Sequence, residues 1–155
     1  MQEQPIEFRC DSMSVLSGPN RNLCRHNVVI RRGDLVVCCE QFEGVADEAW
    51  QWQRFVCRKD VRARRGADTI WAEEATFFAA GADLVLQGKP ILQRGDSILQ
   101  GERVRLNMRD DRAHITRPIG SLQSPAAAAT ALPIAASGSG PLPATCPIGP
   151  FGGAA

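Results

Sequence analysis

The sequence predicts an all-β fold of stacked, bent antiparallel hairpins, and three observations lead to this prediction. Landmark positions recur at steps of 14 or 15 residues, which makes about four repeats of about 29 residues each. Such a period indicates units that bury a face only against their neighbours. Apolar and polar residues alternate inside each repeat, as in strands with one buried face. Glycine followed closely by an acid separates the alternating stretches, as in hairpin turns.

The hairpins follow one another along the chain. The first joins two alternating strands across a turn at residues 32–34, and the second and third have turns at residues 65–68 and 94–96. One residue of such a turn must adopt a positive φ, which glycine does without steric cost. These three turns therefore set the hairpin ends of the predicted fold.

A small residue followed by an acid marks the middle of each repeat. The pair begins at Cys10, Cys39, Ala72 and Gly101, and beyond it the apolar side chains move from even to odd positions. A change of parity requires an extra residue, which means a bulge or a corner. Each segment of 14 or 15 residues is therefore predicted to form two short strands that meet at a bend, up to sixteen strands in all.

Four extra residues interrupt the spacing between Cys39 and Cys57, and the inserted region carries Trp50 and Trp52. Tryptophan combines a large apolar ring with a polar N–H group. Two interpretations therefore remain open: a short helical turn that caps the interior, or a pair of rim contacts for a ligand.

Composition divides the chain into a folded part at residues 5–117 and a tail at residues 118–155. Every charged residue lies at or before Arg117, whereas the tail is rich in proline, alanine and glycine. A segment of this composition buries too little apolar surface to offset the loss of conformational entropy. The tail is therefore predicted to be disordered.

The charge balance and the scarcity of catalytic side chains argue against two classes of protein. The chain carries 18 basic and 17 acidic residues, so no basic field is available to hold nucleic acid. It has two histidines and no tyrosine, and it shows no phosphate-binding glycine loop, nucleophile elbow or zinc spacing. The acids after the small residues lie on the outward side of the bends, where solvated carboxylates are ordinary. We predict that the protein is not an enzyme and uses neither a cofactor nor a metal.

Six cysteines occur, and four of them occupy equivalent, inward-facing positions of the repeat: Cys10, Cys24, Cys39 and Cys57. Cysteine at such positions acts as a small apolar filler, which is the interpretation that we favour. Disulfides and a zinc site are the alternatives, and the lack of any C-x-x-C pair argues against zinc.

Several short motifs, taken in order, carry a family resemblance. Residues 8–13 (FRCDSM) are similar to an "apolar, x, Ala, Asp" strand, residues 27–28 (NV) to an Asn-Val strand start, and residues 86–91 (LQGKPI) to a Leu-x-Gly-x-Pro step. Residues 95–102 then follow in the same order. Over residues 6–117 the chain resembles the OstA-like family of lipopolysaccharide transport proteins, which includes LptA, LptC and the periplasmic N-terminal domain of LptD.

This resemblance implies an OstA-like β-jelly roll that shields the acyl chains of lipopolysaccharide in an apolar lumen during transport to the outer membrane. Burial of acyl chains gains about 0.8 kcal/mol per CH₂ group, so no polar catalytic group is needed. The open edge strands imply association with other OstA-like domain proteins, or with further copies as a homo-oligomer, by strand addition. The predicted lumen residues are Phe8, Val28, Ile30, Val37, Phe42, Val61, Ile70, Phe77, Leu86, Leu92, Leu99, Val104 and Leu106.

The resemblance also implies a periplasmic location. No secretory signal is visible at the start of the sequence, which leaves a cytoplasmic location as the alternative. Cysteines stand where the family has alanines. In an exported protein Cys10 with Cys39, or Cys24 with Cys57, could approach one another across neighbouring repeats.

A β-solenoid structural polymer resembling the bactofilins is the rival interpretation, because the export signal is missing and the cysteines look reduced. The solenoid repeat is usually shorter and richer in glycine and valine than the repeat found here. A third interpretation is a fragment or adaptor of a larger transport subunit. Filaments without bound lipid would favour the polymer.

Overall fold

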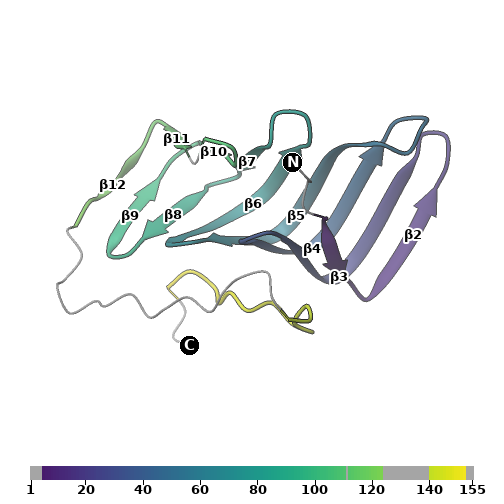
Figure 1. Cartoon of the computed structure of the whole chain (residues 1–155). Coiled ribbons are helices and arrows are strands. Elements are labelled where there is room, and N and C mark those ends of the chain that lie inside the picture. The colour runs from purple at the N-terminus through teal and green to yellow at the C-terminus, as the bar shows by residue number, and fades with distance from the viewer. Residues whose placement is uncertain (1–4, 111, 124–139, 153–155) are drawn as a thin grey trace.

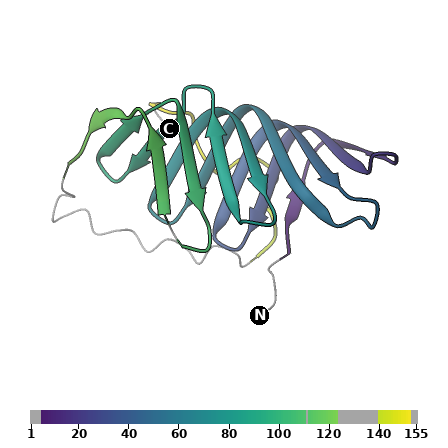
Figure 2. The same cartoon turned by 90° about the horizontal axis from the view of Figure 1, so that it is seen from above.

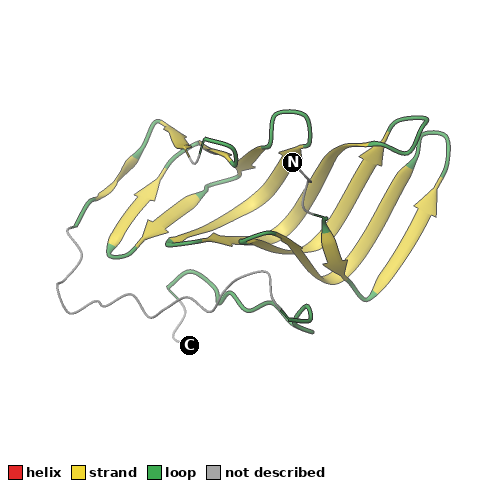
Figure 3. Ribbon diagram, in the orientation of Figure 1, coloured by secondary structure: helices red, strands yellow, loops and turns green. Residues whose placement is uncertain are grey.

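The computed structural model describes residues 5–110, 112–123 and 140–152, and within these ranges it contains twelve β-strands and no helix (Figure 3). No described segment could therefore span a bilayer as a helix. All pairings are antiparallel and form one unclosed sheet. The strands are β1 (Glu7–Arg9), β2 (Ser12–Leu16), β3 (Arg21–Arg32), β4 (Leu35–Ala46), β5 (Trp52–Arg65), β6 (Asp68–Phe78), β7 (Asp83–Gln87), β8 (Ile91–Arg94), β9 (Ser97–Gln100), β10 (Arg103–Asn107), β11 (Arg112–Thr116) and β12 (Ile119–Ser121).

The prediction of an all-β jelly roll of bent hairpins is confirmed. A β-solenoid of the parallel kind is excluded as the fold of the described residues, because its coils stack strands in parallel. The count of strands differs from the predicted sixteen for a simple reason. Each of β3, β4, β5 and β6 runs through its bend without a break and so contains two of the predicted short strands.

The bends coincide with bulges in the sheet. The β3–β4 register shifts between Arg25 and Val28, and the β5–β6 register shifts between Arg58 and Val61. Two consecutive residues at each bulge adopt a left-handed backbone, with φ of 67° at His26 and 51° at Asn27 in β3. The extra residues reverse the side-chain parity, which is the change that the sequence pattern predicted.

The bends fold the sheet into two layers joined along one side (Figures 1 and 2). One layer, which we call the turn layer, contains the three hairpin turns. It consists of β1, β8, β9, β12 and residues 28–32, 35–39, 61–65 and 68–72. The opposite layer, which we call the loop layer, consists of β2, β7, β10, β11 and residues 21–25, 41–46, 52–58 and 74–78.

The hairpin turns of the turn layer each have two residues between the strands. Gly33, Gly66 and Gly95 occupy the first position with φ of 59°, 59° and 58°. A positive φ at this position matches the right-handed twist of the two strands, which explains why the sequence has glycine there. We call the open side of the roll, opposite the bends, the mouth; the three turns line its turn-layer rim.

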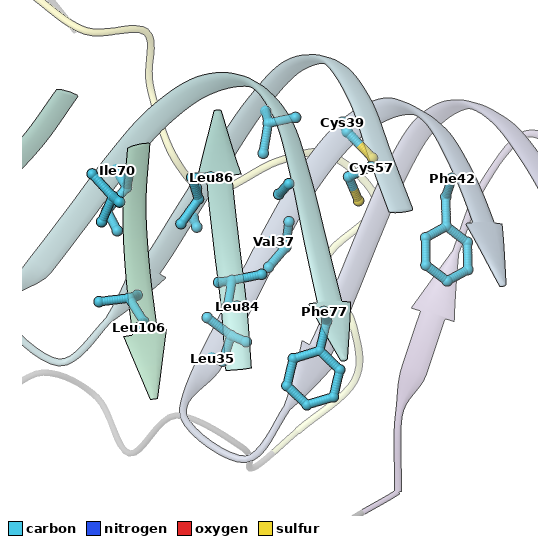
Figure 4. Packing of buried hydrophobic residues seen from close by; sticks show 14 of the residues in the cluster. Leu35, Val37, Cys39, Phe42, Cys57, Ile70, Phe77, Leu84, Leu86 and Leu106 are labelled. Carbon is cyan, nitrogen blue, oxygen red and sulfur yellow. The ribbon is translucent and has the colours of Figure 1, made fainter. Parts of the chain in front are cut away.

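The hydrophobic core lies between the two layers. Val28, Ile70, Leu86 and Val104 are each at most 1% exposed, and they come from strands along most of the length of the roll. Figure 4 shows the labelled side chains of this cluster pointing into the space between the strands. Apolar burial on the inner face of both layers is therefore what holds the roll together.

The predicted disordered tail at residues 118–155 differs from the structure in two places. Residues 119–121 form β12, which pairs with β9 and extends the turn layer beyond the expected boundary at residue 117. Residues 140–152 lie on the outer face of the turn layer, and we call them the C-terminal strap (yellow in Figure 1). Residues 124–139, also part of that prediction, lie outside the described residues.

The C-terminal strap crosses β3, β4, β5 and β6 in that order. Its carbonyl oxygens accept hydrogen bonds from Arg31 at 2.7 Å, Arg62 at 2.8 Å and the Trp71 indole at 2.8 Å. Ile148 is 1% exposed and packs with Val29 of β3. Composition does not predict the strap, because part of the apolar surface on which the strap packs lies at outward-facing positions of the sheet.

Candidate functional site

The thirteen predicted lumen residues lie on the inner faces of the two layers. Ten are buried in the core cluster, and Ile30 and Leu99 are half-buried against it. Phe8 is 41% exposed, and its ring stacks on that of Phe42 with a centroid distance of 6.5 Å. Their inward placement therefore agrees with the parity argument, whereas contact with lipid stays a prediction.

In this conformation the interior is almost filled by its own side chains. The partly open apolar pocket between the layers has a volume of about 40 Å³ and is lined mainly by Ile30, Leu35, Phe42, Phe55, Phe77 and Leu84. On this measure one water molecule needs about 10–15 Å³, so the pocket has room for a few waters and not for an acyl chain. Uptake of a chain therefore requires the two layers to move apart.

The construction of the roll allows such a movement at the mouth. The β-strands connect the layers through the bends, on one side only. On the other side two arginines of the turn layer reach across to the loop layer. The Arg32 guanidinium lies 5.1 Å from the centroid of the Phe77 ring, and Arg65 donates a hydrogen bond to the Met108 carbonyl at 3.3 Å. These are non-covalent contacts that can open and re-form.

Arg32, Arg65 and Arg94 occupy the same position of the repeat, directly before the turn glycine. Two strand spacings, about 10 Å, separate each from the next along the rim. Arg65 pairs with Asp34 at 3.2 Å, and Arg94 pairs with Asp68 at 2.7 Å. Within the described part of the chain Arg32 has no ion pair. These arginines are not among the predicted site residues, although the sequence shows their shared repeat position and inward parity.

An aromatic row follows the loop layer along the mouth. The rings of Phe42 and Phe55 stack with a centroid distance of 5.7 Å. The rings of Phe77 and Trp52 are tilted against that of Phe55, with centroid distances of 6.4 and 5.4 Å. Rings at these distances attract one another beyond the effect of burial alone. Phe55 was not among the predicted lumen residues, although it lies at the centre of this row.

The inserted region forms a short loop between β4 and β5, in which the Trp50 backbone N–H donates a hydrogen bond to the Asp47 carbonyl at 3.0 Å; this closes a single turn, and no helix is assigned there. The Asp47 carboxylate accepts hydrogen bonds from the backbone N–H groups of Ala49 and Gln51, both at 2.9 Å, and these bonds hold the loop in place. Trp50 and Trp52 are 42% and 36% exposed at the rim of the mouth. Contact with a ligand there stays a prediction.

The acids after the small residues bind groups near the bends. Asp11 accepts a hydrogen bond from the Asn27 side chain, and Glu40 accepts one from the Asn27 backbone N–H, both at 3.0 Å. Glu102 pairs with Arg117 at 3.1 Å. The described residues contain no group of three or more metal-ligating side chains. Asp11 and Glu40 therefore stabilise the bulge of β3 at Asn27.

The cysteines pair differently from either pairing considered above. Cys10 forms a disulfide with Cys24, and Cys38 forms one with Cys146 of the C-terminal strap. Cys10 lies at the bend between β1 and β2, both of which pair with β3, and this places it beside Cys24 of β3. The interpretation as unpaired apolar fillers is therefore wrong for Cys10 and Cys24.

Cys39 and Cys57 remain free and are buried in the core, as the filler interpretation expected. Their sulfur atoms lie close together in Figure 4. Burial raises the pKa of the Cys57 thiol well above its ordinary value, and the hydrogen bond and charge of Cys39 raise it further. The thiol is therefore protonated at neutral pH and is a poor nucleophile.

The fold and the sequence of this chain were compared with those of known proteins. No family model matches the chain. The structure is similar to that of LptH from Pseudomonas aeruginosa, the LptA-homologous periplasmic component of its lipopolysaccharide transport device. The TM-score is 0.70 at 12% sequence identity, over 78% of this chain and 96% of LptH.

A second similarity comes from sequence. Over 59 residues, 38% of this chain, the sequence is 29% identical to the LPS-assembly protein LptD of Nitrosomonas europaea, and the match spans only 8% of that protein. The structural likeness concerns the fold, and the sequence match is independent of it. The resemblance of this chain to the OstA-like family is thus confirmed, by the fold that it shares with LptH and by its sequence match to LptD.

Proposed function

We propose that this chain is a non-enzymatic module of lipopolysaccharide transport that shields acyl chains between its two layers. The observation that carries the proposal is the apolar core, to which both layers contribute and which the β-strands close on one side only. The fold shared with LptH and the sequence match to LptD support it. By the same likeness to LptH we propose a periplasmic location.

Acyl chains would enter as the layers part at the mouth. The contacts of Arg32 with Phe77 and of Arg65 with Met108 would break first, because they bridge the layers on the open side. Each CH₂ group that leaves water gains about 0.8 kcal/mol. Several acyl chains together would therefore offset the separation of side chains that now fill the interior.

The two ends of the sheet support association with similar domains. β1 and β2 pair only with β3 at one end, and β11 and β12 pair only with β10 and β9 at the other. Val15 of β2 and Ile119 of β12 are 62% and 78% exposed. Strands that have one unpaired edge and exposed apolar side chains are suited to strand addition. We propose that such addition joins this chain to other OstA-like domains or to further copies of itself.

Uptake of purified lipopolysaccharide by delipidated protein tests the function. The strand β9 offers a matched pair of variants, because Leu99 packs against the core and Ile98 has the opposite parity, while both are half-buried. We expect Leu99→Asp to reduce uptake at least tenfold and Ile98→Asp to leave it unchanged. Circular dichroism would verify that both variants are folded. Equal uptake by the two folded variants would contradict an interior binding site.

A further inference from the structure

We propose that Arg32 anchors the anionic head group of an amphiphile whose hydrocarbon chain enters the interior of the roll. This inference rests on the proposed function and adds a specific recognition site to it. The class of ligand is a chain of apolar carbon that ends in a phosphate or a carboxylate. Arg32 supplies the charge, and the aromatic row beside it supplies the apolar surface.

Arg32 has an unusual place for a charged residue. It continues the inward parity of β3, in which Val28 is buried in the core and Ile30 packs against it. Its side chain is half-buried, and the contact that it makes is with the ring of Phe77 at 5.1 Å. A cation in apolar surroundings is costly unless an anion neutralises it. The position is therefore prepared for an anion.

Arg65 and Arg94 occupy the position of Arg32 in other repeats, and comparison with them shows that, in the part of the chain that the structure describes, the charge lacks an acidic partner in one repeat only, that of Arg32. Arg65 has Asp34 as its partner, and Arg94 has Asp68. No carboxylate of the described residues pairs with Arg32, although it precedes its turn glycine in the same way. The mouth thus contains one cation without a counter-charge in a row of otherwise neutralised pairs.

Two hollows meet at Arg32. The apolar pocket of about 40 Å³ lies on its inner side, and a larger hollow of about 710 Å³ lies at the mouth. Ile6, Arg32 and Phe55 line both, while Trp52 and Gln53 line only the outer one. None of the described residues that line the outer hollow is acidic. A head group in the outer hollow would therefore meet Arg32 while its chain points toward the core.

Three probes with the same twelve-carbon chain separate the contribution of the head group from that of the chain. They are n-dodecyl phosphate, dodecanoate and the uncharged n-dodecyl maltoside, each used below its critical micelle concentration. Isothermal titration calorimetry would measure their binding to the full chain at low and at high salt. We expect at least one of the two anionic probes to bind about tenfold more tightly than the maltoside at low salt, as one charge-assisted hydrogen bond provides. Salt should weaken this preference if the charge is exposed to solvent.

Arg32→Gln should reduce the binding of the anionic probes to the level of the maltoside. The matched control is Arg94→Gln, which removes an arginine from the same position of another repeat and should leave the preference unchanged. The thermal unfolding of both variants would show that they are folded. The relative affinities of the phosphate and carboxylate probes identify which anion the site prefers.

The outcomes distinguish the two proposals. Equal binding of all three probes, or an anionic preference that survives Arg32→Gln, would overturn the role of Arg32 and leave chain binding in place. Binding of none of the probes, together with no uptake of lipopolysaccharide, would overturn the proposed function and this inference with it. A preference that Arg94→Gln abolishes equally would assign the effect to the general charge of the rim and would overturn the specific site.

Discussion

Cys38 and Cys146 are linked by a disulfide with their Cα atoms 5.8 Å apart, although 108 positions separate them in the sequence. The bond connects the outer face of β4 to the C-terminal strap. Ile148 is the buried side chain of the strap, and its burial contributes about 1.5–3 kcal/mol. Ordering the backbone costs about 1–2 kcal/mol for every residue. The disulfide therefore adds to the hydrogen bonds from Arg31, Arg62 and Trp71 in holding the strap on the sheet.

Replacement of both cysteines, Cys38→Ser with Cys146→Ser, should release the strap. We expect the Trp71 indole to lose its hydrogen bond to Gly149 and its contact with Phe151, so that its fluorescence shifts to longer wavelength. The free energy of unfolding should fall by about 2–4 kcal/mol, as on loss of a native disulfide. The pair Cys10→Ser with Cys24→Ser is the control, because it removes a disulfide distant from Trp71. An unchanged Trp71 signal in the first variant would show that the strap docks without its disulfide.

Leu86→Ala should destabilise the roll strongly. Leu86 is 0% exposed between the layers, so its truncation leaves a cavity as well as losing apolar burial. We expect the free energy of unfolding to fall by about 2–5 kcal/mol, measured by chemical denaturation. Leu122→Ala is the matched control, because Leu122 is 77% exposed, and it should change stability by less than about 0.5 kcal/mol. A similar effect of the two substitutions would contradict the packed interior.

Gly120→Ala should detach β12 from β9. A Cβ atom at residue 120 would meet the Ile98 carbonyl oxygen and come within 2.8 Å of the Leu99 Cα, so the two backbones would have to separate. We expect faster amide hydrogen exchange in β12 and in its partner residues 98–100, with little change elsewhere. Gly149→Ala serves as the comparison, because nothing lies within 4 Å of its Cβ position. Retained protection of β12 in the first variant would be inconsistent with this close approach.

Acid should weaken the fold in part through Asp83. Hydrogen bonds from Arg105 and Asn107 lower the pKa of the Asp83 carboxyl below its ordinary value of 3.8. A lowered pKa in the folded state adds stability above pH 3.8, and this contribution disappears as the pH falls through the lowered value. Asp83→Asn should therefore reduce the loss of stability on acidification below about pH 4, whereas Asp96→Asn in an exposed turn should not. The free energy of unfolding of the wild type and of both variants would be measured as the pH is lowered. A smaller loss of stability in Asp96→Asn than in Asp83→Asn would contradict the role of Asp83.

The repeat made much of this fold predictable. The turn glycines at residues 33, 66 and 95 and the parity change at each bend are local features, which depend on a few neighbouring residues. Inward parity likewise placed twelve of the thirteen predicted lumen residues in or against the core. Phe8 lies at the edge, since β1 has a partner on one side only.

The features that the pattern missed depend on contacts between distant segments. Trp50 and Trp52 could not be assigned to a loop or a helix, because their place depends on the Asp47 carboxylate within the loop and on the ring of Phe55, three residues after Trp52 in β5. Arg65 and Arg94 each have an acidic partner, whereas Arg32 has none among the described residues. This difference depends on which acid the neighbouring strand or turn places beside each arginine. Such pairings have no periodic signature.

The amino-acid sequence by itself determined the all-β class, the bends, the turns and the inner face, because alternation and glycine act over a few residues. The tertiary structure alone decided the cysteine pairs, the position of the C-terminal strap and the unpaired charge at the mouth. Each of these needs two surfaces that meet only after the sheet has bent into layers. Cys146, for example, finds Cys38 because the folded turn layer presents an outward apolar strip on which the strap can lie.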